Sequence, residues 1–97
     1  MVTIGMNYHV IAGREKQFEG ACKRVVDLMG EVDGHDNSQI FRRIDGGDGP
    51  EYLIVSRWTE ESAFRSFIAS DAFRKVTSWG KEHILSARPS HTTYREQ

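Results

Sequence analysis

The sequence predicts an α+β fold of the ferredoxin-like type. In this fold the order βαββαβ builds a four-stranded antiparallel sheet with its helices on one face. Three observations predict it. Residues 3–11 alternate between apolar and polar side chains, as a half-buried strand does. Residues 14–30 repeat apolar side chains every three to four positions, and residues 52–79 run from an apolar strand into two helical segments.

The first strand is expected over residues 3–11. Its alternation directs four apolar side chains toward the helices, namely Ile4, Met6, Tyr8 and Val10. The opposite face carries Asn7 and His9, two residues apart. This pair is a candidate for orienting a substrate oxygen or supplying a base. Ordinary polar residues at a dimer interface are the alternative.

The first helix is expected over residues 14–30, with Cys22 on its apolar stripe. A thiol on that stripe is expected to be buried rather than reactive. The following residues, 31–37, have the composition of a polar turn, which places His35 in solvent.

Two strands joined by a hairpin should follow, at residues 38–45 and 51–58. The connection, residues 46–50, contains three glycines and a proline. Arg43 is a candidate for binding an anionic group of a ligand. A surface charge at a sheet edge is the alternative.

Two capping signals place the second helical region. Thr59 followed by acidic residues predicts a helix over residues 60–69, and Ser70 predicts that a new helix begins there. Trp79 is expected to point inward, and Gly80 is expected to end this helix. Pro89 precludes further helix, so residues 90–96 are expected to form the fourth strand.

Helices on one face leave the other face of the sheet open. That face also carries apolar residues such as Phe41 and members of the third strand. An apolar sheet face needs a second cover, and the simplest cover is another copy of the chain. We therefore expect a homodimer with the sheets face to face, enclosing a cavity.

Composition narrows the class of protein. The 97 residues suit one domain, residues 1–97, and the net charge of −1 argues against nucleic acid or an anionic membrane as partner. A single cysteine forms no internal disulfide, which favours a reducing, cytoplasmic setting. The histidines lack the close spacing of a zinc site, so no metal site is expected.

The run W-T-E-E-S-A-F-R-S-F-I-A-S-D-A-F, residues 58–73, together with Asn7 on the first strand, resembles the antibiotic biosynthesis monooxygenase superfamily. This resemblance implies dimeric α/β barrels. It also implies activities that include cofactor-free oxygenation of aromatic polyketides and degradation of haem. The implied ligand is a small aromatic or tetrapyrrole molecule.

The haem-degrading branch of this superfamily uses an asparagine, a tryptophan and a histidine. The resemblance carries these positions onto Asn7, Phe67 and Thr77, so two of the three residues are replaced. His83, about six residues further on, is a candidate substitute ligand, with a surface histidine at a helix end as the alternative. His9 and His91 are two further candidates for a substitute ligand.

Two kinds of function follow from the resemblance. The first is a small oxygenase, cofactor-free or linked to haem, with Asn7 orienting the reacting oxygen and His9 or His83 as base or ligand. The second is a binding or sensor dimer that keeps the fold without the chemistry, which the replacements at Phe67 and Thr77 favour. A helper domain for a haem enzyme is a third hypothesis.

Overall fold

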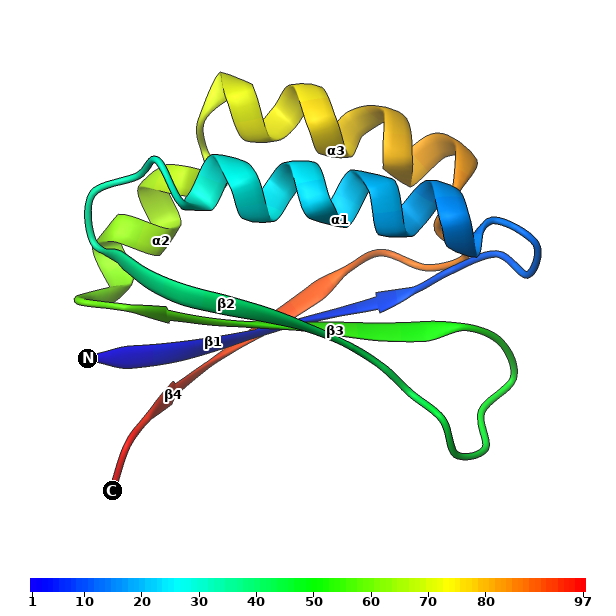
Figure 1. Cartoon of the computed structure of the whole chain (residues 1–97), viewed down its shortest axis with the longest axis horizontal. Helices are drawn as coiled ribbons and strands as arrows, with labels where there is room; N and C mark the ends of the chain where they lie inside the picture. Colours follow the sequence, from blue (N-terminus) through cyan, green and yellow to red (C-terminus); the bar gives the residue numbers. More distant parts are fainter.

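A four-stranded antiparallel sheet carries three helices on one of its faces (Figure 1). The elements follow one another as β1 (Val2–His9), α1 (Glu15–Met29), β2 (His35–Arg42), β3 (Glu51–Trp58), α2 (Glu61–Ile68), α3 (Asp71–His83) and β4 (Ser90–Arg95). The computed structural model describes the backbone of residues 1–97 and the side chains of residues 1–77 and 83–97. The predicted ferredoxin-like order is confirmed.

The strands are ordered β2-β3-β1-β4, so β1 lies between β3 and β4. Met6 of β1 lies opposite Ile54 of β3 and His91 of β4. Residues paired directly across antiparallel strands point to the same face. His91 therefore shares the helix-covered face with Met6, a placement that depends wholly on this register.

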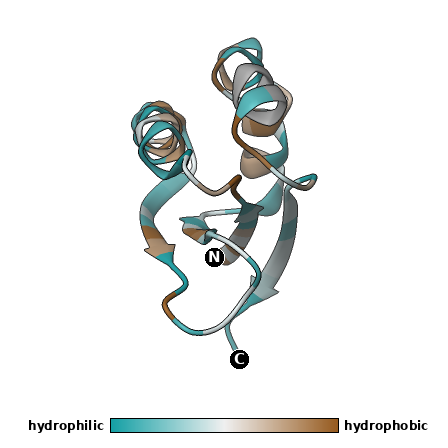
Figure 2. Ribbon diagram, turned by 90° about the vertical axis from the view of Figure 1, so that its right-hand side faces the viewer, coloured by the Kyte–Doolittle hydropathy of each residue, from teal (hydrophilic) through white to brown (hydrophobic). Residues whose placement is uncertain are grey.

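The core lies between the sheet and the helices (Figure 2). The predicted inward face of β1 is confirmed, Cys22 is buried as expected, and Trp58 is fully buried as well. The core cluster is Ile4, Met6, Tyr8, Val10, Phe18, Cys22, Val25, Met29, Tyr52, Ile54, Trp58, Phe64, Phe67 and Ile84. Burying each large apolar side chain contributes roughly 1.5–3 kcal/mol before the entropy cost of ordering it.

The second strand begins earlier than predicted, at His35, and the solvent-facing prediction for this histidine is wrong. Its ring lies edge-on to Trp58 with centroids 5.1 Å apart, and its Nε2 lies 2.7 Å from Ser38 Oγ. Gly34 explains the shift, because its positive φ of 95° turns the chain directly into the strand.

One of the two helix caps differs from the prediction. The N-cap of α2 is Glu60 with no capping side chain, whereas the Thr59 amide donates to the Gly34 carbonyl at 2.7 Å. The Ser70 cap is confirmed, since the Phe73 amide donates to Ser70 Oγ at 3.2 Å. The helix after it continues through residue 80 to His83, so the predicted end at Gly80 is wrong. A helical glycine costs only about 1 kcal/mol relative to alanine, which packing readily offsets.

The orientation predicted for the Trp79 side chain lies outside the described residues. Among the described residues, no helix has the length and apolar character needed to cross a membrane.

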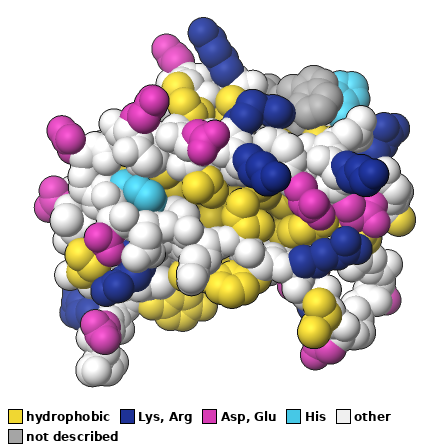
Figure 3. All heavy atoms as spheres, in the orientation of Figure 1, with side chains coloured by type: hydrophobic (Ala, Val, Ile, Leu, Met, Phe, Trp, Pro, Cys, Tyr) yellow, Lys and Arg dark blue, Asp and Glu magenta, His cyan; other side chains and the backbone are white. Residues whose placement is uncertain are grey.

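The face of the sheet away from the helices is uncovered, as predicted. Phe41 and Tyr94 are about half exposed there, and Leu53 and Val55 are partly buried. Apolar side chains are visible on this side of the sheet, along the lower edge of Figure 3. The α+β, ferredoxin-like class is thus confirmed together with its open apolar face.

Candidate functional site

A cavity of about 150 Å³ lies between the helices and the β1–β4 half of the sheet. It exists because α3 packs mainly against α1 and stands off from the strands (Figure 1). Its wall is formed by Met6, Tyr8, Phe18, Ala21, Cys22, Val25, Ile54, Phe64, Ile68, Phe73, Val76, Thr77, Leu85, Pro89, Ser90 and His91. Most of these side chains are aliphatic, aromatic or sulfur-containing, so the cavity favours an apolar ligand.

Two of the polar groups in the wall stay protonated at neutral pH. Burial raises the pKa of the Cys22 thiol to about 12. Burial also raises the pKa of Tyr8 above its usual range. Neither group therefore supplies a base, and Thr77 Oγ1 already donates to the Phe73 carbonyl at 2.8 Å.

His91 stands at the mouth of the cavity. Its ring lies edge-on to Phe64 with centroids 5.3 Å apart, and its side chain remains exposed on the outer strand β4. Histidine is the side chain that most readily exchanges a proton near neutral pH. Among the described residues of this wall, His91 is therefore the group suited to act as a base toward a bound molecule.

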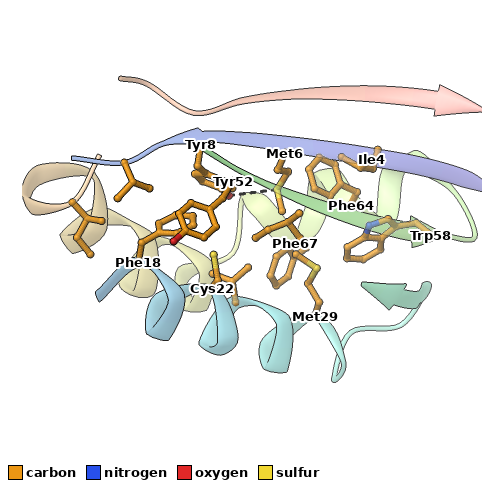
Figure 4. Close-up of a cluster of buried hydrophobic side chains, with 14 residues drawn as sticks. Ile4, Met6, Tyr8, Phe18, Cys22, Met29, Tyr52, Trp58, Phe64 and Phe67 are labelled. Carbon is orange, nitrogen blue, oxygen red and sulfur yellow. Dashed lines mark hydrogen bonds between the residues drawn. The ribbon is translucent and has the colours of Figure 1, made fainter. Parts of the chain in front are cut away.

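Phe67 and Thr77, carried over from the family resemblance, lie on the helical side of this region. Thr77 lines the cavity directly. Phe67 does not line the cavity but is buried against Trp58 (both labelled in Figure 4) and against the cavity residue Phe73, at centroid distances of 5.8 and 5.1 Å. Both positions are therefore close to a ligand in the cavity, although only Thr77 would contact it.

Asn7, His9 and Arg43 lie elsewhere, around the carboxylate of Glu51. Asn7 Nδ2 donates to Glu51 Oε2 at 3.0 Å, and Arg43 Nη1 donates to Glu51 Oε1 at 3.2 Å. His9 Nδ1 lies 3.7 Å from Glu51 Oε1. The hydrogen bond from Asn7 and then that from Arg43 lower the pKa of Glu51, so this carboxylate is ionised at neutral pH.

The sheet itself separates Asn7 from Phe67 and Thr77. Asn7 pairs with Leu53 and Ser90 on the open face, whereas Thr77 reaches the cavity on the helix-covered face. The structure therefore does not bring the three positions of the resemblance into one pocket. His83, the proposed substitute ligand, is exposed at the end of α3 and is not part of the cavity wall.

The cavity role of His91 was not singled out from the sequence, because residues 90–95 show no apolar alternation that would orient the strand. Only the pairing with Met6 decides which way it faces. Within the described residues, no group of three histidine, cysteine or acidic side chains is arranged to hold a metal ion.

Relatives at the sequence level cover almost the whole chain. A Natronomonas pharaonis protein named "Putative heme-binding protein" is 33% identical over 89 residues, which is 92% of this chain and 14% of that protein. A Haloarcula marismortui protein of the same name is 32% identical over 90 residues, 92% of this chain and 13% of that protein. The chain thus spans about one seventh of the length of these relatives.

Solved structures reproduce the fold at low sequence identity. SnoaB, a cofactor-independent oxygenase from Streptomyces nogalater, superposes with a TM-score of 0.82 at 19% identity, covering 99% of this chain and 92% of SnoaB. A conserved protein from Methanosarcina mazei Go1 superposes with a TM-score of 0.85 at 16% identity, covering 99% of this chain and 92% of that protein.

The sequence model of one family, antibiotic biosynthesis monooxygenase, matches residues 1–79. This match spans β1 through most of α3 and so includes most of the cavity wall. It confirms the resemblance drawn from residues 58–73. The chain belongs to the antibiotic biosynthesis monooxygenase family.

Proposed function

We propose that this chain is a cofactor-free oxygenase that holds a small aromatic molecule in the cavity between sheet and helices, with His91 as the base. The observation that carries the proposal is an apolar cavity of about 150 Å³ with one histidine at its mouth. An apolar cavity of roughly that volume holds a single aromatic ring in other proteins. The substrate is therefore expected to be one ring or little more.

The reaction needs only a base and a substrate that is acidic enough. His91 accepts a proton from a methylene group that is activated by an adjacent ring or carbonyl. The resulting anion supplies electrons to O₂. One oxygen atom remains as a new carbonyl and the other leaves as water, so CH₂ and O₂ become C=O and H₂O. The apolar wall keeps bulk water from the anion.

A second function is favoured by the names of the relatives, namely a ligand-binding domain without chemistry inside a larger haem protein. Those names belong to whole proteins, of which the matched segment is about one seventh. The cavity does not itself suit haem. Its volume is below the roughly 300–1,000 Å³ that drug-sized ligands occupy, and Thr77 in its wall provides no iron ligand, so His91 is the one histidine of the described wall that could bind iron.

The open sheet face supports the homodimer expected from the sequence. Phe41, Leu53, Val55 and Tyr94 all lie on this face, and a β-carbon added to Gly5 between them would lie 3.6 Å from both Leu53 Cδ1 and Tyr94 Cε2. An apolar patch of this kind on a small chain is typical of an interface. A second copy would cover the patch and shield the Glu51 cluster beside it.

Oxygen uptake tests the proposed activity. Purified protein is given small aryl ketones with a methylene group next to the carbonyl while dissolved O₂ is recorded, with His91→Ala beside the wild type and His83→Ala as the matched control. Loss of a general base is expected to slow uptake by roughly 10²–10⁴-fold, and the control is expected to match the wild type. Ligand binding without uptake would favour the non-catalytic function instead.

A haem titration tests the alternative independently. Because the cavity is small, we expect no saturable shift of the Soret absorbance band with this chain alone. A saturable band that is lost in His91→Ala or His83→Ala would identify an iron ligand. It would contradict the conclusion that this chain alone does not hold haem.

A further inference from the structure

Two tyrosines occupy equivalent places in the core. Tyr8 of β1 and Tyr52 of β3 lie directly opposite one another and face the helices. Their rings lie 5.1 and 4.7 Å from the ring of Phe18. Both are buried, with 7% and 2% of their surface exposed. Their hydroxyl groups, however, have very different partners.

Tyr52 has a strong acceptor. Its hydroxyl donates to Glu19 Oε2 at 2.6 Å, a charge-assisted hydrogen bond. The Tyr8 hydroxyl has one hydrogen-bond partner within the described part of the chain, Met6 Sδ at 3.7 Å (Figure 4). A thioether is a weak acceptor, whereas buried tyrosine hydroxyls usually find a full partner. Tyr8 therefore retains most of its capacity to donate.

Tyr8 lies where a bound molecule could accept a hydrogen bond from its hydroxyl group. Tyr8 and Met6 both line the cavity, and Tyr52 does not. We infer that Tyr8 donates a hydrogen bond to an oxygen atom of the bound molecule and so selects oxygen-bearing aromatic ligands over plain hydrocarbons. This inference deepens the proposed function and rests on its cavity.

The register also orients such a ligand. His91 pairs with Met6, and Tyr8 lies two residues beyond Met6 on the same face, so Tyr8 and His91 are diagonal neighbours. Diagonal neighbours on adjacent strands lie roughly 7–8 Å apart, a span that one ring with a carbonyl substituent bridges. The ligand oxygen would then rest at Tyr8 while the acidic hydrogen is presented toward His91. Aryl ketones with a hydrogen-bearing carbon next to the carbonyl satisfy this arrangement.

Tyr8 acts here as a positioning residue and a donor. Burial raises its pKa above the usual range, so its hydroxyl stays protonated at neutral and mildly alkaline pH. The same burial makes the hydrogen bond stronger than it would be in water.

The test uses two probes of nearly equal shape, acetophenone and ethylbenzene, of which only the first carries an oxygen acceptor. Their dissociation constants are measured by calorimetry for the wild type, Tyr8→Phe and the matched control Tyr52→Phe. We expect the wild type and Tyr52→Phe to prefer acetophenone by about 3- to 10-fold, the range of one net hydrogen bond. Tyr8→Phe should lose this preference and keep its affinity for ethylbenzene.

The outcomes separate the two proposals. An unchanged preference in Tyr8→Phe, or equal binding of both probes by the wild type, overturns the role of Tyr8 and leaves the cavity site standing. Binding of neither probe by the wild type overturns both proposals.

A second measurement does not depend on the variant folding. The infrared carbonyl band of acetophenone bound to the wild type should lie below its position in hexane if the oxygen accepts a hydrogen bond. A band at the hexane position would overturn the inference.

Discussion

Gly34 lies directly against Ala63 of α2. A β-carbon added to Gly34 would stand 2.7 Å from Ala63 Cβ and 3.2 Å from Thr59 Oγ1. The backbone of Gly34 also has a φ of 95°, and its carbonyl accepts the Thr59 amide at 2.7 Å. One small residue thus joins the start of β2 to the turn between β3 and α2.

The substitution Gly34→Ala is expected to lower the free energy of unfolding by more than about 2 kcal/mol, since it combines backbone strain with overpacking. Gly13→Ala is the matched control. Gly13 has a similar φ of 94°, but a β-carbon added there would have none of the described atoms within 4 Å. Only the backbone strain remains, so a loss of about 1 kcal/mol in the free energy of unfolding is expected. Urea unfolding measures both, and equal losses would show that the contact with Ala63 is unimportant.

The two core tyrosines should differ in their effect on stability. Tyr52→Phe removes a hydrogen bond to a carboxylate, and we expect a loss of about 1 kcal/mol, at the low end because Glu19 is exposed to solvent. Among the described residues, Tyr8→Phe removes one contact with sulfur, so its stability should stay within about 0.5 kcal/mol of the wild type. Thermal unfolding followed by circular dichroism checks the order of the two variants.

Alkaline pH should destabilise the fold by deprotonating Tyr52. Burial and then the hydrogen bond with Glu19 raise the pKa of Tyr52 to about 12, from about 10 in an unfolded chain. Because the pKa of Tyr52 is higher in the folded than in the unfolded chain, this tyrosine contributes stability that is fully present below about pH 10. That contribution is lost as pH rises toward 12. The slope of stability against pH in this window should be shallower in Tyr52→Phe. An identical slope would show that Tyr52 is not responsible.

Asn7→Ala tests the role implied by the family resemblance. Because Asn7 contacts Glu51 on the open face, we expect acetophenone affinity and oxygen uptake to match the wild type. His91→Ala, on the helix-covered face, should impair uptake. Loss of activity in Asn7→Ala alone would place the chemistry on the open face of the sheet.

The apolar face can be tested through the assembly state. Leu53→Lys introduces a charge at the centre of the open face, so a homodimer should dissociate to monomer in size-exclusion chromatography with light scattering. Ile44→Lys is the control, because Ile44 is 98% exposed in the hairpin rather than on the sheet. A wild-type monomer, or a dimer that tolerates Leu53→Lys, would contradict the proposed interface.

Local patterns were enough to predict much of the fold. The alternation of β1 separates Met6 and Tyr8 from Asn7 and His9, and the structure confirms both faces. The errors occur where a distant contact decides a local conformation. His35 pairs with Trp58 of β3 and packs on its ring, and the chain at Thr59 is tied to Gly34 instead of capping α2.

By itself the sequence determined the α+β class and the apolar faces, because these depend on periodicities within single segments. The resemblance carried by residues 58–73 and Asn7 gave the family. Only the tertiary structure decided which chemistry-bearing residues meet. It places His91 beside a cavity lined by Tyr8, and it leaves Asn7 on the other side of the sheet from Thr77. Within the described side chains, it also provides Glu19 as a partner for Tyr52 and a thioether as the partner for Tyr8. Strand register and helix packing join residues far apart in the chain, and no local pattern specifies those pairings.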